Sequence, residues 1–68
     1  MNTYLISNFT RPEAGQVTAK GEDERDAVLK LLRLTGDNRG ICEVVQKGHG
    51  DWHVLIQNGW TMVVSQIG

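Results

Sequence analysis

Four side chains in this sequence suggest a metal site or a nucleophile: a cysteine, two histidines and the aspartate between them. They are Cys42, His49, Asp51 and His53. A structural zinc site needs four ligands at fitting spacing, and Cys42 has no CxxC partner. The segment from His49 to His53 crosses from a turn into a strand, so its two imidazoles need not converge as they would on a helix. The sequence therefore predicts no metal site and no bound cofactor.

Nucleophilic catalysis would need Cys42 beside a histidine that a third group orients. The spacing along the chain provides no such contact. The glycines of Lys47-Gly48-His49-Gly50 resemble a phosphate-binding loop, but neither a Walker pattern nor a strand–turn–helix context accompanies them. A chain of 68 residues also has little material for a deep pocket with a rigid supporting shell. We therefore expect a binding protein and not an enzyme.

Size and charge narrow the class of binding protein. The 68 residues predict a single domain, 1–68, near the lower limit for folding alone. A net charge of -1 without a basic cluster does not favour direct nucleic-acid binding. No secretory signal follows Met1, no apolar run reaches the roughly 20 residues of a membrane span, and a lone cysteine excludes an intrachain disulfide. These features predict a cytoplasmic protein with no membrane association.

Residue patterns predict five strands and one helix. Segments rich in β-branched, aromatic or alternating apolar residues predict strands, and an amphipathic stretch predicts the helix. Strands are expected at 3–9, 16–20, 41–47, 52–57 and 60–67, the helix at 23–35, and a loop or turn at 10–15, 37–40 and 48–51. The order is β-β-α-β-β-β. We predict an α+β fold in which a single antiparallel sheet of about five strands packs on one α-helix.

The expected helix begins with acidic residues and carries its basic residues later, which matches the helix macrodipole. The acids are Glu22, Asp23, Glu24 and Asp26. Glu22 or Asp23 suits the N-cap, and Gly36 is well placed to close the C-terminus. Two interpretations of the acids remain open: a solvated helix start, or a partner surface that opposes lysines which normally hold nucleic acid.

Asn58-Gly59 predicts a β-hairpin with a two-residue type I′ turn. The opposed pairs would be Gln57 with Trp60, Leu55 with Met62, and His53 with Val64. Both faces of this hairpin are then substantially apolar. One helix of about 13 residues, roughly 20 Å long, can cover only one face of the sheet.

The uncovered face is the predicted partner-binding surface. We place Trp52, Val54, Ile56 and Val63 on the helix side, because that face has fewer polar interruptions. The predicted partner-binding residues are then Trp60, Met62, Leu55 and His53. Two alternatives remain open here: the opposite assignment of faces, and a purely structural role for Trp60 at the end of the hairpin.

The opening segment Met1-Asn2-Thr3-Tyr4-Leu5-Ile6 is similar to the start of small phage-encoded anti-CRISPR proteins that act on type I systems. The resemblance continues in plan, with a strand ending near Val17-Thr18-Ala19, an acidic-started helix from Asp23 to Leu34, and a strand meander. It implies an inhibitor in the host bacterial cytoplasm that docks on a CRISPR effector complex and blocks DNA binding or nuclease recruitment. The resemblance assigns no contact residues.

Two other functions fit the same residues. A homodimeric structural or assembly protein would bury a self-complementary uncovered face. A weak single-stranded nucleic-acid module would stack bases on Trp52 and Trp60.

Overall fold

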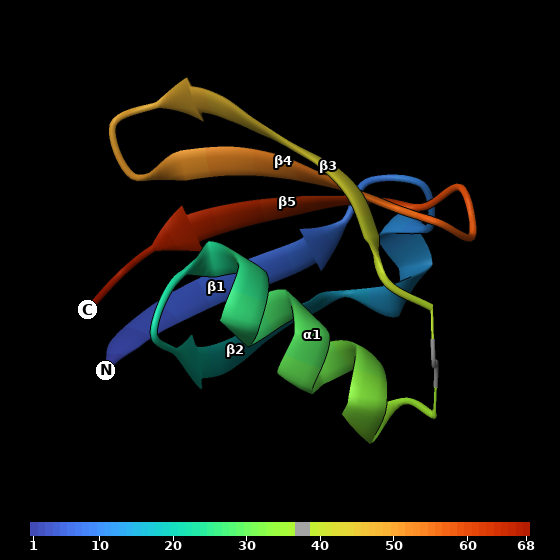
Figure 1. Cartoon of the computed structure of the whole chain (residues 1–68), viewed down its shortest axis with the longest axis horizontal. Helices are drawn as coiled ribbons and strands as arrows, with labels where there is room; N and C mark the ends of the chain where they lie inside the picture. Colours follow the sequence, from blue (N-terminus) through green and yellow to red (C-terminus); the bar gives the residue numbers. More distant parts are fainter. Residues whose placement is uncertain (37–38) are drawn as a thin grey trace.

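The computed structural model describes residues 1–36 and 39–68 (Figure 1). Its elements in chain order are β1 (Asn2–Asn8), the short 3-10 helix η1 (Pro12–Ala14), β2 (Gln16–Gly21), α1 (Glu24–Leu34), β3 (Ile41–Gly48), β4 (Asp51–Ile56) and β5 (Thr61–Gln66). The predicted fold class and element order are confirmed: one antiparallel sheet packs on one α-helix. Residues 37 and 38 of the predicted turn at 37–40 lie outside the described residues.

The five strands follow the order β2-β1-β5-β4-β3, and every neighbouring pair is antiparallel. The last strand, β5, therefore lies in the centre of the sheet, between β1 and β4. Its pairing with β1 brings the two ends of the chain together, with Tyr4 opposite Gln66. Figure 1 shows α1 over one face of the sheet, nearest to β2 and β1. We call this face the helix face and the opposite one the open face.

The first turn of α1 is held by two of its acidic residues. Asp23 is the N-cap, and its Oδ1 accepts a hydrogen bond from the Asp26 N–H at 2.8 Å. The Asp26 carboxylate in turn accepts from the Glu22 N–H at 2.9 Å and forms an ion pair with Lys30 at 3.1 Å. These bonds satisfy backbone donors that a helix start leaves without partners. Of the two residues predicted to suit the N-cap, Glu22 and Asp23, it is Asp23 that caps the helix.

The carboxylate of Asp26 makes the stability of the fold depend on pH. Its pKa lies below the ordinary 3.8, first because the Glu22 N–H donates to it and then because of Lys30. A carboxylate with a lowered folded-state pKa stabilises the fold above its ordinary pKa, and this contribution is lost as pH falls through the folded-state pKa. We expect Asp26→Asn to be less stable than the unmodified protein at neutral pH.

That difference should shrink as urea unfolding is repeated between about pH 7 and pH 2. Glu24→Gln is the matched control, because Glu24 lies on the same turn and takes no part in these bonds. A difference between Asp26→Asn and the unmodified protein that stays constant with pH would contradict this account.

The core lies entirely on the helix face. Its buried apolar residues are Tyr4, Ile6, Ala27, Val28, Leu32, Val54, Ile56, Met62 and Val64. Trp52 and Trp60 are half-buried and pack against this core from its margin. The rings of Tyr4 and Trp52 meet edge to face, with centroids 5.9 Å apart. The core is therefore one layer deep, between a single helix and one side of the sheet.

The hairpin between β4 and β5 differs from the prediction by one residue. The Ile56 N–H donates to the Trp60 carbonyl at 2.8 Å, and the Gly59 N–H donates to the Ile56 carbonyl at 2.9 Å. The loop is thus three residues long, 57–59. Gly59 has a φ of 93°, whereas Asn58 has no positive φ, so the turn is not type I′. The Asn58 side chain instead accepts from the Trp60 N–H at 2.9 Å.

This extra loop residue corrects the predicted faces. Val54 lies opposite Met62, and His53 lies opposite Val63. Because side chains alternate along a strand, a one-residue shift moves every side chain of β5 to the other face. Met62, only 5% exposed, belongs to the core, and Trp60 packs on the same helix face.

The prediction that Trp60 and Met62 lie on the uncovered face was therefore wrong, and so was the placement of Val63 under the helix. Placing Trp52, Val54 and Ile56 on the helix side was correct. Leu55 and His53 lie on the open face, as predicted.

Candidate functional site

The open face has an apolar centre that no described element covers. Its apolar members come from four strands, and each is half-buried: Leu5, Val45, Leu55 and Val63. The described helix α1 crosses the sheet on the other face, where it buries Ala27, Val28 and Leu32. A sheet with a solvated outer face normally alternates apolar and polar residues strictly. The open face departs from that pattern at its middle.

Cross-strand pairing places Val63 at the centre of this apolar group. One row across the sheet contains four residues, each paired with the next. In order they are Ser7, Val63, His53 and Val45. Leu55 belongs to the next row, paired with Thr61, and Leu5 to the row on the other side, paired with Ser65. Leu5 and Leu55 are thus diagonal neighbours of Val63, within reach of large side chains.

Phe9 extends the apolar group to one corner of the open face. Its N–H donates to the Thr61 carbonyl at 2.9 Å, so it continues the line of β1 one residue beyond the end of that strand. Its side chain is 70% exposed. Beside it lies a shallow hollow lined by Ser7, Asn8, Phe9, Pro12, Gly15, Gln16 and Val63. An aromatic ring next to a hollow is a feature of interfaces with a second macromolecule.

Neither Phe9 nor Val63 was among the predicted residues of the partner-binding surface. For Phe9 a signal existed: Leu5, Ser7 and Phe9 alternate along one strand and must share a face. For Val63 there was none, because its face depends on the number of residues in the hairpin loop.

Polar residues of the open face lie both beside Val63 and toward the edges of the sheet: Ser7 and His53 are its cross-strand neighbours, and Thr61 and Ser65 flank it on the same strand face. Asp51 accepts a hydrogen bond from the Ser65 hydroxyl at 2.8 Å. Glu43 is paired with Leu55 at the β3 edge, and Lys20 is paired with Thr3 at the β2 edge. Glu43 is thus a direct neighbour of Leu55, whereas no Asp, Glu, Lys or Arg is paired with Leu5 or Val63.

The four side chains that could carry chemistry are not brought into one site. Cys42 is exposed on β3, and His49 follows that strand in an exposed turn. His53 is half-buried in the middle of the open face, with Asp51 two residues away on the same strand. Across residues 1–36 and 39–68, no group of three or more His, Cys, Asp or Glu side chains is placed to hold a metal ion.

The acidic residues before and within the first turn of α1 form a surface separate from the open face. They lie on the helix side of the sheet. Asp23 and Asp26 are engaged in the helix cap, whereas Glu22 is exposed and Glu24 half-buried. The structure thus divides the eight predicted binding residues among three places. His53 and Leu55 are on the open face, Trp60 and Met62 in or against the core, and the four acids at the start of α1.

Comparison with known proteins gives no match to a family model, a curated sequence or a solved structure. In the described part of the chain, no helix is long and apolar enough to cross a membrane.

Proposed function

We propose that this protein is a non-catalytic inhibitor that binds a protein partner through the open face. The observation that carries this proposal is the apolar group on the side of the sheet that α1 leaves uncovered, formed by Leu5, Val45, Leu55, Val63 and Phe9. Its partner, by resemblance of the first six residues to phage anti-CRISPR proteins, is a subunit of a type I CRISPR effector complex. Docking there blocks DNA binding or nuclease recruitment in the bacterial cytoplasm.

The composition of the open face favours a protein partner. Interface centres are depleted in charged residues and enriched in aromatic and aliphatic ones, with polar residues at the rim. Around Val63 the open face mixes aliphatic and polar side chains, with no Asp, Glu, Lys or Arg paired with Val63, and Glu43 and Lys20 lie at the edges of the sheet. Strands also hold side chains more rigidly than loops, which reduces the entropy lost on binding.

The small size of the domain limits the surface area that its open face can offer to a partner. Its Cα atoms span 26 × 22 × 21 Å, so one face offers only several hundred Å². A standard interface takes about 800 Å² from each partner. The partner must therefore also reach beyond the apolar centre, and the exposed ring of Phe9 with its hollow is the adjoining surface suited to this contact.

The positions of the tryptophans do not favour base stacking as the function. Trp52 and Trp60 both lie on the helix face and pack against the core. Single-stranded nucleic-acid binders present aromatic rings along a basic groove. The open face has neither a tryptophan nor a row of basic residues.

A second copy of this chain is the second candidate partner, favoured by the central position of β5. In such a dimer the two open faces would meet about a two-fold axis parallel to β5. Val63 would then lie against Val63 of the second copy, and β1 against β4 of the second copy. Leu5 would then face the side of the copy that carries Leu55. Light scattering after size exclusion distinguishes this dimer from the inhibitor acting as a monomer.

A charge at the centre of the open face should abolish partner binding. We expect Val63→Lys to weaken capture of the effector complex by at least about 100-fold, because the ammonium group would be desolvated without a partner. Gln46→Lys is the matched control, since Gln46 is exposed and lies on the helix-face side of β3. Circular dichroism checks that both variants keep the fold.

The inhibitor function is tested with phage plaquing on hosts with active type I immunity. The unmodified chain and Gln46→Lys should allow plaques, and Val63→Lys should not. Immunity that is unchanged by the unmodified chain across the major type I subtypes would defeat the proposed partner. Full inhibition by Val63→Lys would defeat the proposed surface.

A further inference from the structure

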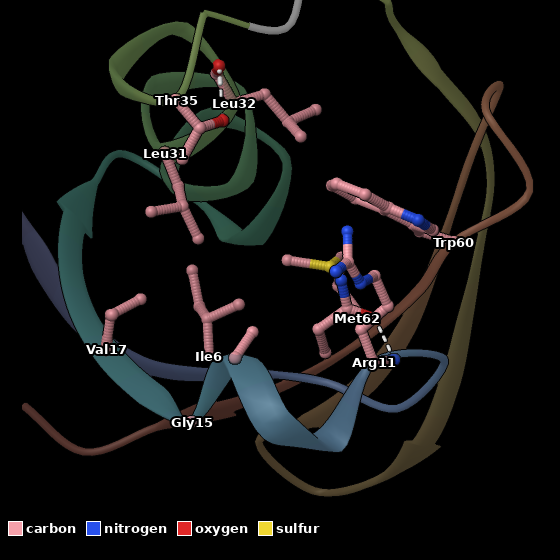
Figure 2. Close-up of a pocket in the computed structure, with 11 residues that line it drawn as sticks. Ile6, Arg11, Gly15, Val17, Leu31, Leu32, Thr35, Trp60 and Met62 are labelled. Carbon is pink, nitrogen blue, oxygen red and sulfur yellow. Dashed lines mark hydrogen bonds between the residues drawn. The ribbon is translucent and has the colours of Figure 1, made fainter.

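A cavity of about 300 Å³ lies on the helix side, between the C-terminal half of α1 and the loop that carries η1 (Figure 2). The apolar side chains around it come from five elements and from Trp60, and Figure 2 shows Ile6, Leu31, Leu32 and Met62 directed toward one central space. Trp60 stands at one side of that space, with its indole ring facing the end of α1. Ligand sites typically measure about 300–1,000 Å³, so this cavity suits a small molecule.

One of the polar residues lining the cavity, Asn8, is almost completely buried. It is 7% exposed, and its Oδ1 accepts a hydrogen bond from the Arg11 N–H at 3.0 Å. Because the Oδ1 accepts this bond, the group of Asn8 considered for a ligand is its NH₂ group, which can only donate hydrogen bonds. Within residues 1–36 and 39–68 no hydrogen bond uses that NH₂ group, and because no buried side-chain nitrogen there lacks a partner, the group is in contact with solvent at the cavity.

Among residues 1–36 and 39–68, Arg11 is the one charged residue that lines the cavity. Its guanidinium lies 5.9 Å from the centre of the Trp60 ring, and its Nε donates to the Glu13 carboxylate at 3.1 Å. A guanidinium has five N–H donors, so the Glu13 contact leaves the two Nη groups for another acceptor. The Arg11 side chain thus lies beside Trp60 at the cavity (Figure 2).

We propose that this cavity binds a small amphipathic monocarboxylate. The hydrocarbon part would lie among Ile6, Leu31 and Met62, and the carboxylate would accept from the Arg11 Nη groups and the Asn8 NH₂. Among the described residues the lining carries one cation, Arg11, and no acidic side chain; Glu13 pairs with the Nε edge of that guanidinium, so charge complementarity at its Nη groups selects an anion. The cavity lies on the side of the sheet opposite to the open face, so this proposal does not rest on the proposed function.

The first test uses the unmodified protein, titrated with octanoate, 1-octanol and octylammonium and followed by ¹H–¹⁵N correlation spectra. Octanoate should bind about tenfold more tightly than 1-octanol, because it adds charge-assisted hydrogen bonds to the same apolar contact. Octylammonium should bind no more tightly than 1-octanol. The shifted amides should be those around the cavity.

Three outcomes of this titration would overturn the proposal. They are the absence of saturable binding by octanoate, equal affinities for octanoate and 1-octanol, and shifts confined to the open face. Each can be read on the unmodified chain, so the result does not depend on whether any variant folds.

A pair of variants then tests the role of Arg11. Arg11→Gln should lose the preference for octanoate over 1-octanol, while its affinity for 1-octanol stays the same. Arg25→Gln removes the same charge from an exposed position in the first turn of α1 and should keep the preference. An unchanged preference in Arg11→Gln, or an equal loss in both variants, would contradict recognition by Arg11.

Discussion

Met62→Ala is expected to lower the free energy of unfolding by about 2–5 kcal/mol, the loss typical of truncating a buried methionine or leucine to alanine. Met62 is 5% exposed, lies opposite Val54 on the central strand and lines the cavity beneath α1. A domain of 68 residues has a total stability of about 3–10 kcal/mol. The variant should therefore be partly or wholly unfolded, measured by urea unfolding with tryptophan fluorescence and circular dichroism.

Leu55→Ala is the matched control for this prediction. Leu55 is half-buried on the open face, so its truncation should lower the free energy of unfolding by only about 1 kcal/mol. The comparison also tests the register of the hairpin. A two-residue loop would place Leu55 and Met62 on the same face, and similar losses in the two variants would support that register against the one described here.

Gly21→Ala is expected to lower the free energy of unfolding by about 2–3 kcal/mol, at the upper end of overpacking effects. Gly21 is buried at the end of β2, and a Cβ there would lie 2.6 Å from the Ala27 backbone nitrogen and 3.0 Å from the Ala27 Cα. These are backbone atoms of α1, so no side-chain rotation relieves the clash. The whole first turn of the helix would have to move away from the sheet.

Gly48→Ala provides the comparison for Gly21→Ala. Gly48 is exposed at the end of β3, and the nearest atom to an added Cβ is the Asp51 Oδ2 at 3.6 Å, an ordinary contact. Its substitution should change the free energy of unfolding by less than about 0.5 kcal/mol. Equal urea midpoints for the two variants would show that α1 does not approach β2 closely.

The elements of the fold could be predicted because each depends on residues close together in the chain. The acids at the start of α1 and Gly36 after its end mark the helix, and alternation marks the strands. The structure places the helix at Glu24–Leu34 with Asp23 as its cap. Each strand begins and ends within one residue of its expected bounds. The number of elements and their order follow from these local signals.

The residues of the open face could be predicted only in part, because they depend on a single loop residue. Asn58-Gly59 suits a two-residue loop. Gly59 also suits a three-residue loop, because that loop needs a residue with positive φ at its last position. Local turn chemistry thus permits both loops. Leu55 and His53 keep their face in either case because they precede the loop, whereas Trp60, Met62 and Val63 exchange faces.

The residue pattern alone predicts that one amphipathic helix leaves one side of the five-stranded sheet uncovered. This prediction requires only the number and the lengths of the helix and strands. Pairing in three dimensions decides that Val63 is at the centre of that side and that Met62 is beneath α1. The physical reason is that β5 lies between β1 and β4, and its register is set by contacts with strands distant in the chain. The cavity beside Arg11 has the same origin, because η1, α1 and β5 meet there only after the sheet has formed.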